Sequence, residues 1–197
     1  MKERIIISDF DGTLTLCDTL LEIISFKVGR MGLLVRLLSL SPWLLLMRLG
    51  LYSSQRAKER LLSSVFRGVS HDAFADMAQC FASSCRERIM REGLLSELQR
   101  RAGEGTEVIV ITASPTIWVQ PFVPDFAVVG TEMEFDSNGF TGRFASPNCY
   151  GAEKVRRLLG YKPEIAMRRS EFHVTAYGDS RGDKEMLEYA DEPHLIK

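Results

Sequence analysis

The stretch that decides the fold is residues 9–15, which read Asp9-Phe10-Asp11-Gly12-Thr13-Leu14-Thr15. It follows an apolar run over residues 4–8, which predicts a buried strand that opens into a loop at Asp9. Gly12 permits a sharp turn at this point of the chain. The sequence therefore predicts a strand that ends in a tight acidic loop.

Two carboxylates of this loop, Asp9 and Asp11, lie two positions apart. Carboxylates this close repel each other, so a purely structural role would be costly without a cation. A divalent metal removes that conflict and also accepts the oxygens of a phosphate group. Asp9 is then a candidate nucleophile, and Asp11 is a candidate acid that protonates a leaving alcohol. Taken alone, the pair is also compatible with an acidic turn after a strand.

The apolar pattern of the first strand returns at residues 107–112 and 172–177. Helix-like segments alternate with these strands at residues 94–101, 153–159 and 184–190. Strands separated by helices predict an α/β fold with a parallel sheet covered on both faces, and such sheets bind ligands at the carboxyl ends of their strands. Alternation around Asn138-Gly139 predicts a β-hairpin within residues 131–144.

The interval between the first two strands shows no strand pattern from residue 18 to residue 90. Its periodicity is helix-like, with breaks expected near Gly29, Ser41-Pro42, Gly50 and residues 68–70. A crossover between parallel strands does not need an interval of this length. We therefore predict a catalytic core of residues 1–17 and 91–197 and an inserted all-helical cap of residues 18–90.

Polar residues also close the second predicted strand. Thr112 ends it, and its hydroxyl, with the backbone amides that follow from Ala113 on, can form a phosphate cradle beside a helix that Pro115 helps to start. The alternative is an ordinary strand-to-helix connection, in which Ser114 is the expected N-cap.

Three more charged residues fall where a phosphate site would need them. Lys154 begins an amphipathic helix and can supply a fixed cation for developing negative charge. Asp179 and Asp183 follow the third strand and can supply one direct metal ligand and one supporting carboxylate. Each signal is weak alone, but their convergence on one edge of a parallel sheet favours a catalytic site over unrelated turns.

Together these residues resemble the haloacid dehalogenase-like hydrolases, and in particular their phosphoserine phosphatase-like branch, subfamily IB. The shared features are an Asp-x-Asp-Gly-Thr-x-Thr opening, a Ser/Thr strand end, a lysine and a Gly-Asp-x-x-x-Asp closing motif, here residues 178–183. The resemblance implies a Rossmann-like core with a C1-type helical cap and an aspartyl-phosphate formed on Asp9. It further implies phosphate contacts from Thr112, Ala113 and Lys154, and Mg²⁺ bound by Asp9, the Asp11 carbonyl and Asp179 with support from Asp183.

Asp11 favours phosphomonoester hydrolysis over dehalogenation, because dehalogenation has no leaving alcohol to protonate. The substrate stays open. Asp18 stands where phosphoserine phosphatases carry a glutamate for the substrate amine, and Ser180 and Gly182 depart from their closing motif. Asp18 is a candidate substrate contact. A phosphotransferase is the first alternative, and a phosphatase of a lipid-type phosphate such as phosphatidylglycerophosphate is the second.

The composition limits the partners. A net charge of −1 over 197 residues predicts no nucleic-acid partner and leaves a small phosphorylated substrate as the default. The absence of a signal-peptide pattern and of CxxC pairs among the four cysteines predicts a cytoplasmic protein with reduced thiols and no zinc site.

The chain is leucine-rich between Leu33 and Leu51. Arg36 and Arg48 bracket an uncharged run too short for the ~20 residues that a membrane span needs, and Pro42 interrupts it. Two interpretations remain, a buried helical hairpin and a surface that makes peripheral contact with membranes or lipid substrates.

Overall fold

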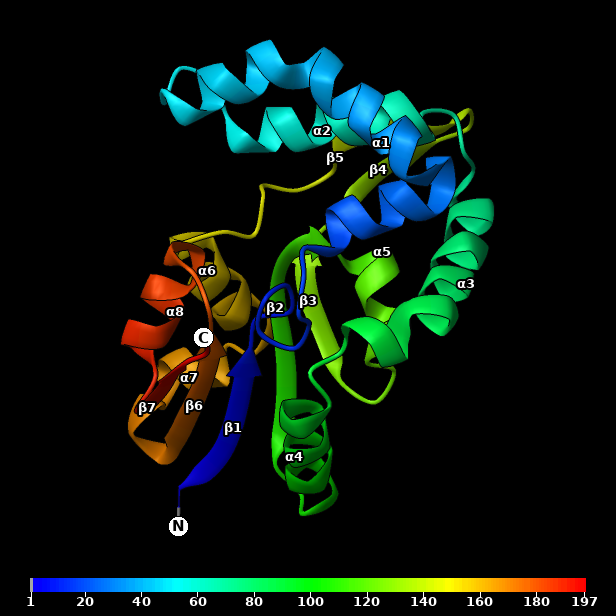
Figure 1. Ribbon diagram of the computed structural model, residues 1–197. Helices are drawn as coiled ribbons and strands as arrows, with labels where there is room; N and C mark the ends of the chain where they lie inside the picture. Colours follow the sequence, from blue (N-terminus) through cyan, green and yellow to red (C-terminus); the bar gives the residue numbers. More distant parts are fainter. Residues whose placement is uncertain (1) are drawn as a thin grey trace.

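The computed structural model describes residues 2–197 and contains a five-stranded sheet in the order β3-β2-β1-β6-β7 (Figure 1). All four strand pairs are parallel. The strands are β1 Glu3–Ser8, β2 Glu107–Pro115, β3 Ala127–Thr131, β6 Phe172–Gly178 and β7 Glu192–Leu195. Along the chain, β2 and β3 are added to the sheet on one side of β1, and β6 and β7 are then added on the other side. The carboxyl ends of β1, β2 and β6 therefore meet at the point where the strand order reverses, which is where ligands of such sheets bind.

Both faces of this sheet are covered, as the alternation of side chains along β1 shows. Ile5 and Ile7 pack into one hydrophobic cluster with residues of α6, α7 and α8, whereas Ile6 packs into a second cluster with residues of α4 and α5. These helices are α4 Glu92–Gly103, α5 Thr116–Val119, α6 Ala152–Tyr161, α7 Glu164–Met167 and α8 Lys184–Tyr189. Short 3-10 turns complete the core at Gln120–Phe122, Arg169–Glu171 and Arg181–Asp183. The predicted parallel α/β sheet is confirmed.

Three helices fill the interval between β1 and α4, and we call them the cap helices. They are α1 Thr19–Arg48, α2 Ser54–Phe66 and α3 His71–Ile89. Each begins at a side-chain cap, since Asp18, Ser53 and Ser70 accept hydrogen bonds from the backbone of the first turn that follows. The division of the chain at residues 18 and 90 remains a prediction.

One expected break in this region is not formed. α1 bends at Gly29, whose φ is 74°, but it continues through Pro42. The proline removes one backbone donor. Packing on both sides of it continues, because Leu40 is buried and the guanidinium of Arg60, on α2, lies 4.1 Å from the centre of the Trp43 ring. The prediction of a helix break at Ser41-Pro42 was therefore wrong.

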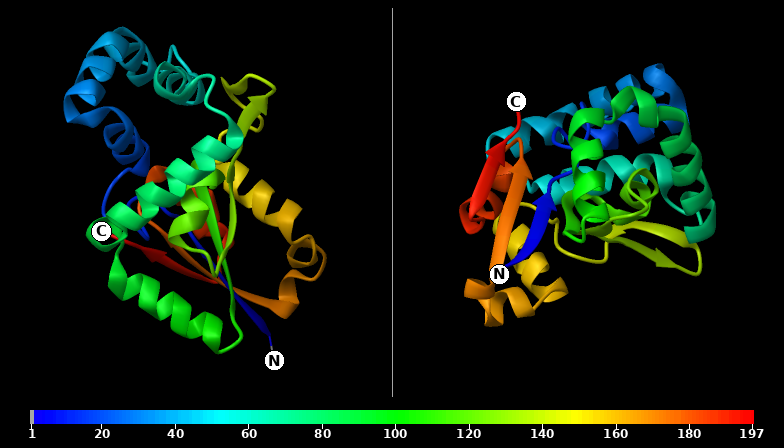
Figure 2. Two further views of the ribbon diagram at one scale, coloured as in Figure 1. Left: turned by 90° about the vertical axis from the view of Figure 1, so that its right-hand side faces the viewer. Right: turned by 90° about the horizontal axis from the view of Figure 1, so that it is seen from below.

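The predicted hairpin is confirmed as β4 Met133–Asp136 and β5 Gly139–Phe144, which pair antiparallel. It lies against α2, at the same end of the sheet as the cap helices (Figure 2). Phe140 exchanges backbone hydrogen bonds with the turn that follows that helix, accepting from Gly68 N at 2.9 Å and donating to Val69 O at 2.8 Å. One hydrophobic cluster thus runs without interruption from β1 through the cap helices to the hairpin.

Candidate active site

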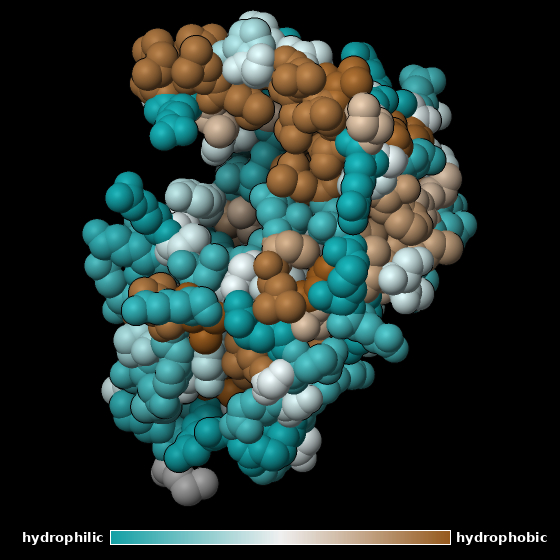
Figure 3. Space-filling view, in the orientation of Figure 1, coloured by the Kyte–Doolittle hydropathy of each residue, from teal (hydrophilic) through white to brown (hydrophobic). Residues whose placement is uncertain are grey.

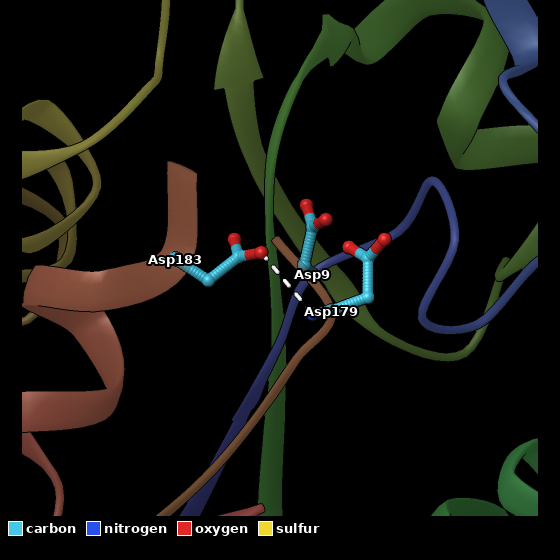
Figure 4. Close-up of side chains that lie close together, drawn as sticks. All are labelled: Asp9, Asp179 and Asp183. Carbon is cyan, nitrogen blue, oxygen red and sulfur yellow. Dashed lines mark hydrogen bonds between the residues drawn. The ribbon is translucent and has the colours of Figure 1, made fainter. Parts of the chain in front are cut away.

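Three aspartates meet at the carboxyl edge of the sheet (Figure 4). Asp9 directly follows β1, and its backbone N–H donates to Tyr177 O of β6 at 2.9 Å, so its position is set by the sheet itself. Asp179 directly follows β6, and Asp183 lies one turn later. Each can offer one carboxylate oxygen such that all three oxygens lie within 4.8 Å of one another.

Lys154 connects two of these carboxylates from the first turn of α6. Its side chain is buried, and Nζ donates to Asp9 Oδ1 at 2.6 Å and to Asp183 Oδ1 at 2.5 Å. Burial alone would lower the pKa of Lys154, but the charges of Asp9 and Asp183 outweigh it and raise that pKa. The side chain is therefore a permanent cation in the floor of the site.

Asp183 holds the closing loop in place. Its Oδ2 accepts hydrogen bonds from Asp179 N at 3.2 Å, from Ser180 N at 3.0 Å and from Ser180 Oγ at 2.9 Å. Although burial opposes it, the charge of Lys154 and these donors lower the pKa of Asp183. Since both of its oxygens are occupied, Asp183 is better suited to position Asp179 and Lys154 than to bind a ligand directly.

The remaining carboxylate oxygens fit a divalent cation. Within residues 2–197, neither Asp9 Oδ2 nor Asp179 Oδ2 has a hydrogen-bond partner. Asp179 Oδ2 lies over the bare Cα of Gly12, where a Cβ would come within 2.2 Å of it. Burial raises the pKa of Asp9 to about 7, against the opposing charge of Lys154. Hard oxygen donors with excess negative charge are the ligand set that Mg²⁺ prefers.

The side chain of Asp11 lies apart from this group. Its Oδ1 accepts from Thr19 N at 2.7 Å and Thr19 Oγ1 at 2.6 Å, and its Oδ2 accepts from Ser114 Oγ at 2.5 Å. The indole Nε1 of buried Trp118 donates in turn to Thr19 Oγ1 at 3.1 Å. Burial, and next the charge of Asp18, raise the pKa of Asp11, which favours a carboxyl that can carry a proton.

Of the residues predicted to form a phosphate cradle, the structure places only some at the cavity. Ala113 lines the cavity at the sheet edge, whereas Thr112 is fully buried and its hydroxyl accepts from Ser114 N at 3.0 Å. Ser114 does not cap the following helix, because α5 begins at Thr116 with Pro115 at the N-cap position and no side-chain cap. Its hydroxyl reaches Asp11 instead, so the N-cap expectation for Ser114 was wrong.

The cavity above these residues has a volume of about 310 Å³, and its wall includes Asp18 and Lys58 from the cap region. Lys58 Nζ donates to Ala113 O and to Asn148 Oδ1, both at 3.3 Å. Burial lowers the pKa of Lys58, although the charges of Asp11 and Asp18 oppose the shift. Sequence reasoning missed this residue. The signal that could have identified it is its position next to Ala57 and three residues before Leu61, on the apolar side of α2.

A family model for the haloacid dehalogenase-like hydrolases matches residues 6–188, a span that contains every candidate residue above. The chain belongs to this family. The resemblance inferred from the sequence motifs is thereby confirmed. Family membership makes the sheet edge that carries Asp9 the candidate active site of a hydrolase.

Known proteins and solved structures resemble the chain over nearly its whole length. Protein CicA of Caulobacter vibrioides is 28% identical in an alignment of 192 residues that covers 93% of this chain and 82% of CicA. A protein of unknown function from Bordetella pertussis Tohama I has a crystal structure that matches with a TM-score of 0.83 at 18% identity, covering 99% of this chain and 90% of that one. A phospho-aspartyl intermediate analogue of phosphoserine phosphatase matches with a TM-score of 0.57 at 17% identity, covering 96% and 84%. These likenesses confirm the predicted Rossmann-like fold.

Proposed function

We propose that the chain is a Mg²⁺-dependent phosphatase that hydrolyses a phosphomonoester through an aspartyl-phosphate on Asp9. The observation that carries this proposal is the position of Lys154 Nζ, 2.6 Å from Asp9 and 2.5 Å from Asp183. A buried cation beside a buried carboxylate, with a second acidic residue across from it, suits a site that binds and transfers a doubly charged phosphoryl group. The carboxyl-edge location and the family membership support the same conclusion.

The first step needs a nucleophile and a proton donor. Asp9 attacks phosphorus, the bond between phosphorus and the ester oxygen breaks, and Asp11 donates a proton to the departing alkoxide. Lys154 holds one phosphoryl oxygen throughout. Mg²⁺ bound by Asp9 and Asp179 would neutralise part of the negative charge on the other phosphoryl oxygens. The raised pKa of Asp11 supports the donor role, because the carboxyl must carry a proton when the substrate arrives.

The second step returns the enzyme to its starting state. Asp11, now deprotonated, takes a proton from water, and the resulting hydroxide attacks the aspartyl-phosphate. Inorganic phosphate leaves, Asp9 regains its carboxylate, and Asp11 regains its proton. The cap region contributes Asp18 and Lys58 to the cavity wall, and we propose that it limits the access of bulk water during the first step.

The residues of the cavity wall support a proposal for the substrate class. Its volume of about 310 Å³ suits a small molecule, and Lys58 and Asp18 offer one cation and one anion to the leaving group. A substrate that carries its own carboxylate or ammonium group beside the phosphate fits such a wall. Phosphoserine is therefore one of the compounds to test, together with phosphomonoesters that lack one or both charges.

The test is a panel of phosphomonoesters assayed with Mg²⁺ for wild type, Asp9→Asn and Asp125→Asn. Asp125 is exposed and lies outside the cavity, so its variant is a matched control. We expect Asp9→Asn to lose about 10,000-fold or more in kcat, the scale on which removal of a nucleophile acts, and the control to keep wild-type rates. Labelled substrate should leave a hydroxylamine-sensitive acyl-phosphate on wild type and on the control only. Activity of Asp9→Asn at wild-type rates would refute the assignment.

Acceptor alcohols added to the same assay separate hydrolysis from phosphoryl transfer. A hydrolase releases inorganic phosphate in equal amount to the product alcohol whatever acceptor is present. A phosphotransferase would release less phosphate than alcohol and form a new phosphate ester.

A further inference from the structure

The outer face of α1 is apolar and exposed. After its bend at Gly29 the helix presents two apolar rows, and the inner row packs into the hydrophobic cluster shared with α2. The outer row faces solvent, with exposed fractions between 47% and 71%. We call this row the outer stripe, and it consists of Met31, Leu34, Val35, Leu38, Leu45 and Leu49.

The outer stripe runs along one side of α1 and is interrupted only at Ser41 and Pro42. Its members are separated by one, three, four or seven positions, so they lie on one side of the helix. Figure 3 shows the resulting apolar surface over α1, at the top of the molecule. A helix that is apolar on two sides is normally buried on both, and an exposed apolar surface of this kind marks a site of interaction.

The charges around the outer stripe indicate its partner. Between Glu22 and Glu59 every charged residue is basic, although the chain as a whole has a net charge of −1. Lys27, Arg30 and Arg48 are exposed on α1 itself. Apolar side chains flanked only by cations are complementary to a surface that is apolar inside and anionic outside.

We propose that the outer stripe binds the surface of a membrane that contains anionic lipid. Leucine, valine and methionine side chains would enter the boundary between headgroups and acyl chains, while Lys27, Arg30 and Arg48 would contact the headgroup charges. The helix would lie in the interface, because within residues 2–197 no helix is long and apolar enough to cross a bilayer. This binding does not depend on the proposed phosphatase activity.

A second copy of the chain fits the outer stripe less well. In a two-fold symmetric dimer the same surface faces itself, so the basic residues of each stripe would meet those of the other. No acidic residue between positions 23 and 58 is available to compensate them. The charge pattern thus favours a lipid surface over self-association.

The experiment is co-sedimentation of the full chain with two kinds of vesicle, one of phosphatidylcholine alone and one of phosphatidylcholine with phosphatidylglycerol. We expect wild type to pellet with the anionic vesicles and much less with the neutral ones. Equal, background pelleting with both vesicles would overturn the proposal, and this comparison needs no variant.

A pair of double variants assigns the binding to the outer stripe. Leu38→Asp with Leu45→Asp alters two stripe residues, and Met167→Asp with Leu195→Asp alters two other residues of similar exposure as a control. We expect the stripe variant to lose about a hundredfold or more in vesicle affinity, since full burial of each leucine corresponds to about tenfold or more. The control should bind as wild type does. Equal loss in both variants would overturn the assignment.

The basic residues are tested separately. Arg30→Glu with Arg48→Glu should abolish the preference for anionic vesicles, whereas Lys2→Glu with Lys184→Glu, elsewhere on the surface, should retain it. Sedimentation velocity tests the alternative partner. A wild-type dimer that the Leu38→Asp, Leu45→Asp variant converts to a monomer, without binding to either vesicle, would show that a second copy covers the stripe.

Discussion

The catalytic edge of the sheet and the outer stripe of α1 are opposites in physical terms. At the catalytic edge, charged groups are buried, and Asp9, Asp183 and Lys154 compensate one another within hydrogen-bond distance. In the outer stripe, apolar groups are exposed, and nothing in residues 2–197 covers them. Both arrangements are unfavourable for an isolated chain, so each indicates a ligand of complementary chemistry.

The difference between the two regions lies in how tightly each is coupled to the folded state. Buried charges depend on one another, so the loss of one partner is felt by the whole fold. Exposed apolar residues contact little, so their replacement leaves the fold intact and changes only binding. Leu38→Asp should therefore keep wild-type stability within about 0.5 kcal/mol, as surface substitutions generally do.

Replacement of the buried cation should have the largest effect on stability. Lys154→Met leaves Asp9 and Asp183 buried without their counter-charge, so we expect the free energy of unfolding to fall by about 3–5 kcal/mol. Urea denaturation measures it, with Lys184→Met, an exposed lysine, as the control. Unchanged stability of Lys154→Met would show that the two carboxylates do not need the lysine. The catalytic edge would then be no more tightly coupled to the folded state than the outer stripe.

Metal removal should make the stability depend on pH. Burial raises the pKa of Asp9 from 3.8 to about 7. A carboxyl with a raised folded pKa contributes stability that is fully present below the unfolded pKa and is lost as the pH rises through the folded pKa. In chelator, the free energy of unfolding should therefore decline between pH 4 and pH 7, by a few kcal/mol at about 1.4 kcal/mol per unit.

Mg²⁺ should reverse this decline, and its stabilising effect should be larger at pH 8 than at pH 5, because the proton and the cation compete for Asp9. Thermal melts across this pH range measure both effects. Asp9→Asn is the control, since it lacks the titrating group and should show a flatter profile. Asp183 acts in the opposite sense, but its lowered pKa confines that effect to pH values below 3.8.

The catalytic edge was largely predictable from sequence because parallel strands place it. Asp9 and Asp179 directly follow paired strands, so knowing the strands was enough to bring them together. Lys154 followed from the chemistry that the site required. Lys58 and Thr19 were not predicted, because they reach the site through the packing of the cap helices, and no strand register specifies that packing.

The strands of the sheet also differ in how well the sequence predicts them. The strongly apolar strands β1, β2 and β6 were predicted, whereas β3 and β7 were not. β3 has an apolar run, Ala127–Val129, but this run is shorter than those of β1, β2 and β6 and was not recognised as a strand. β7 reads Glu192-Pro193-His194-Leu195 and has no buried residue, so it carries no apolar signal. Whether the leucine-rich segment was buried or exposed was also left open. In the structure its inner row is buried at Leu40 and half-buried at Leu33, Leu37 and Trp43, whereas its outer row is exposed, because two apolar rows on one helix cannot both face α2.

A link between the two regions can be tested at Thr19, the first residue of α1. Thr19→Val removes the hydroxyl that donates to Asp11 and leaves Trp118 Nε1 without its acceptor, so we expect a loss of about 1–3 kcal/mol in stability. Thr19→Ser should restore it. Thr116→Val, which removes an exposed hydroxyl bonded to Glu132, is the matched control.

The catalytic readout for Thr19 is the dependence of kcat on the leaving group. If Thr19 positions Asp11 as the proton donor, Thr19→Val should slow alkyl phosphates more than p-nitrophenyl phosphate, whose leaving group needs no proton. A purely structural role would slow both substrates equally.

The smallest expected effect lies at Lys58, where the cap meets the substrate. Lys58→Met removes the cation that α2 contributes to the cavity, so KM should rise about tenfold for a substrate with a carboxylate beside its phosphate, the equivalent of one charge-assisted hydrogen bond. For a neutral alkyl phosphate KM should change little, and kcat should hold for both, because Lys58 does not contact the nucleophile. Arg60→Met is the control, since Arg60 lies on the same helix over the Trp43 ring and does not line the cavity. An equal rise in KM for both substrates would show that Lys58 binds the phosphate group itself. Lys58 would then act with the residues of the catalytic edge and would not select the leaving group.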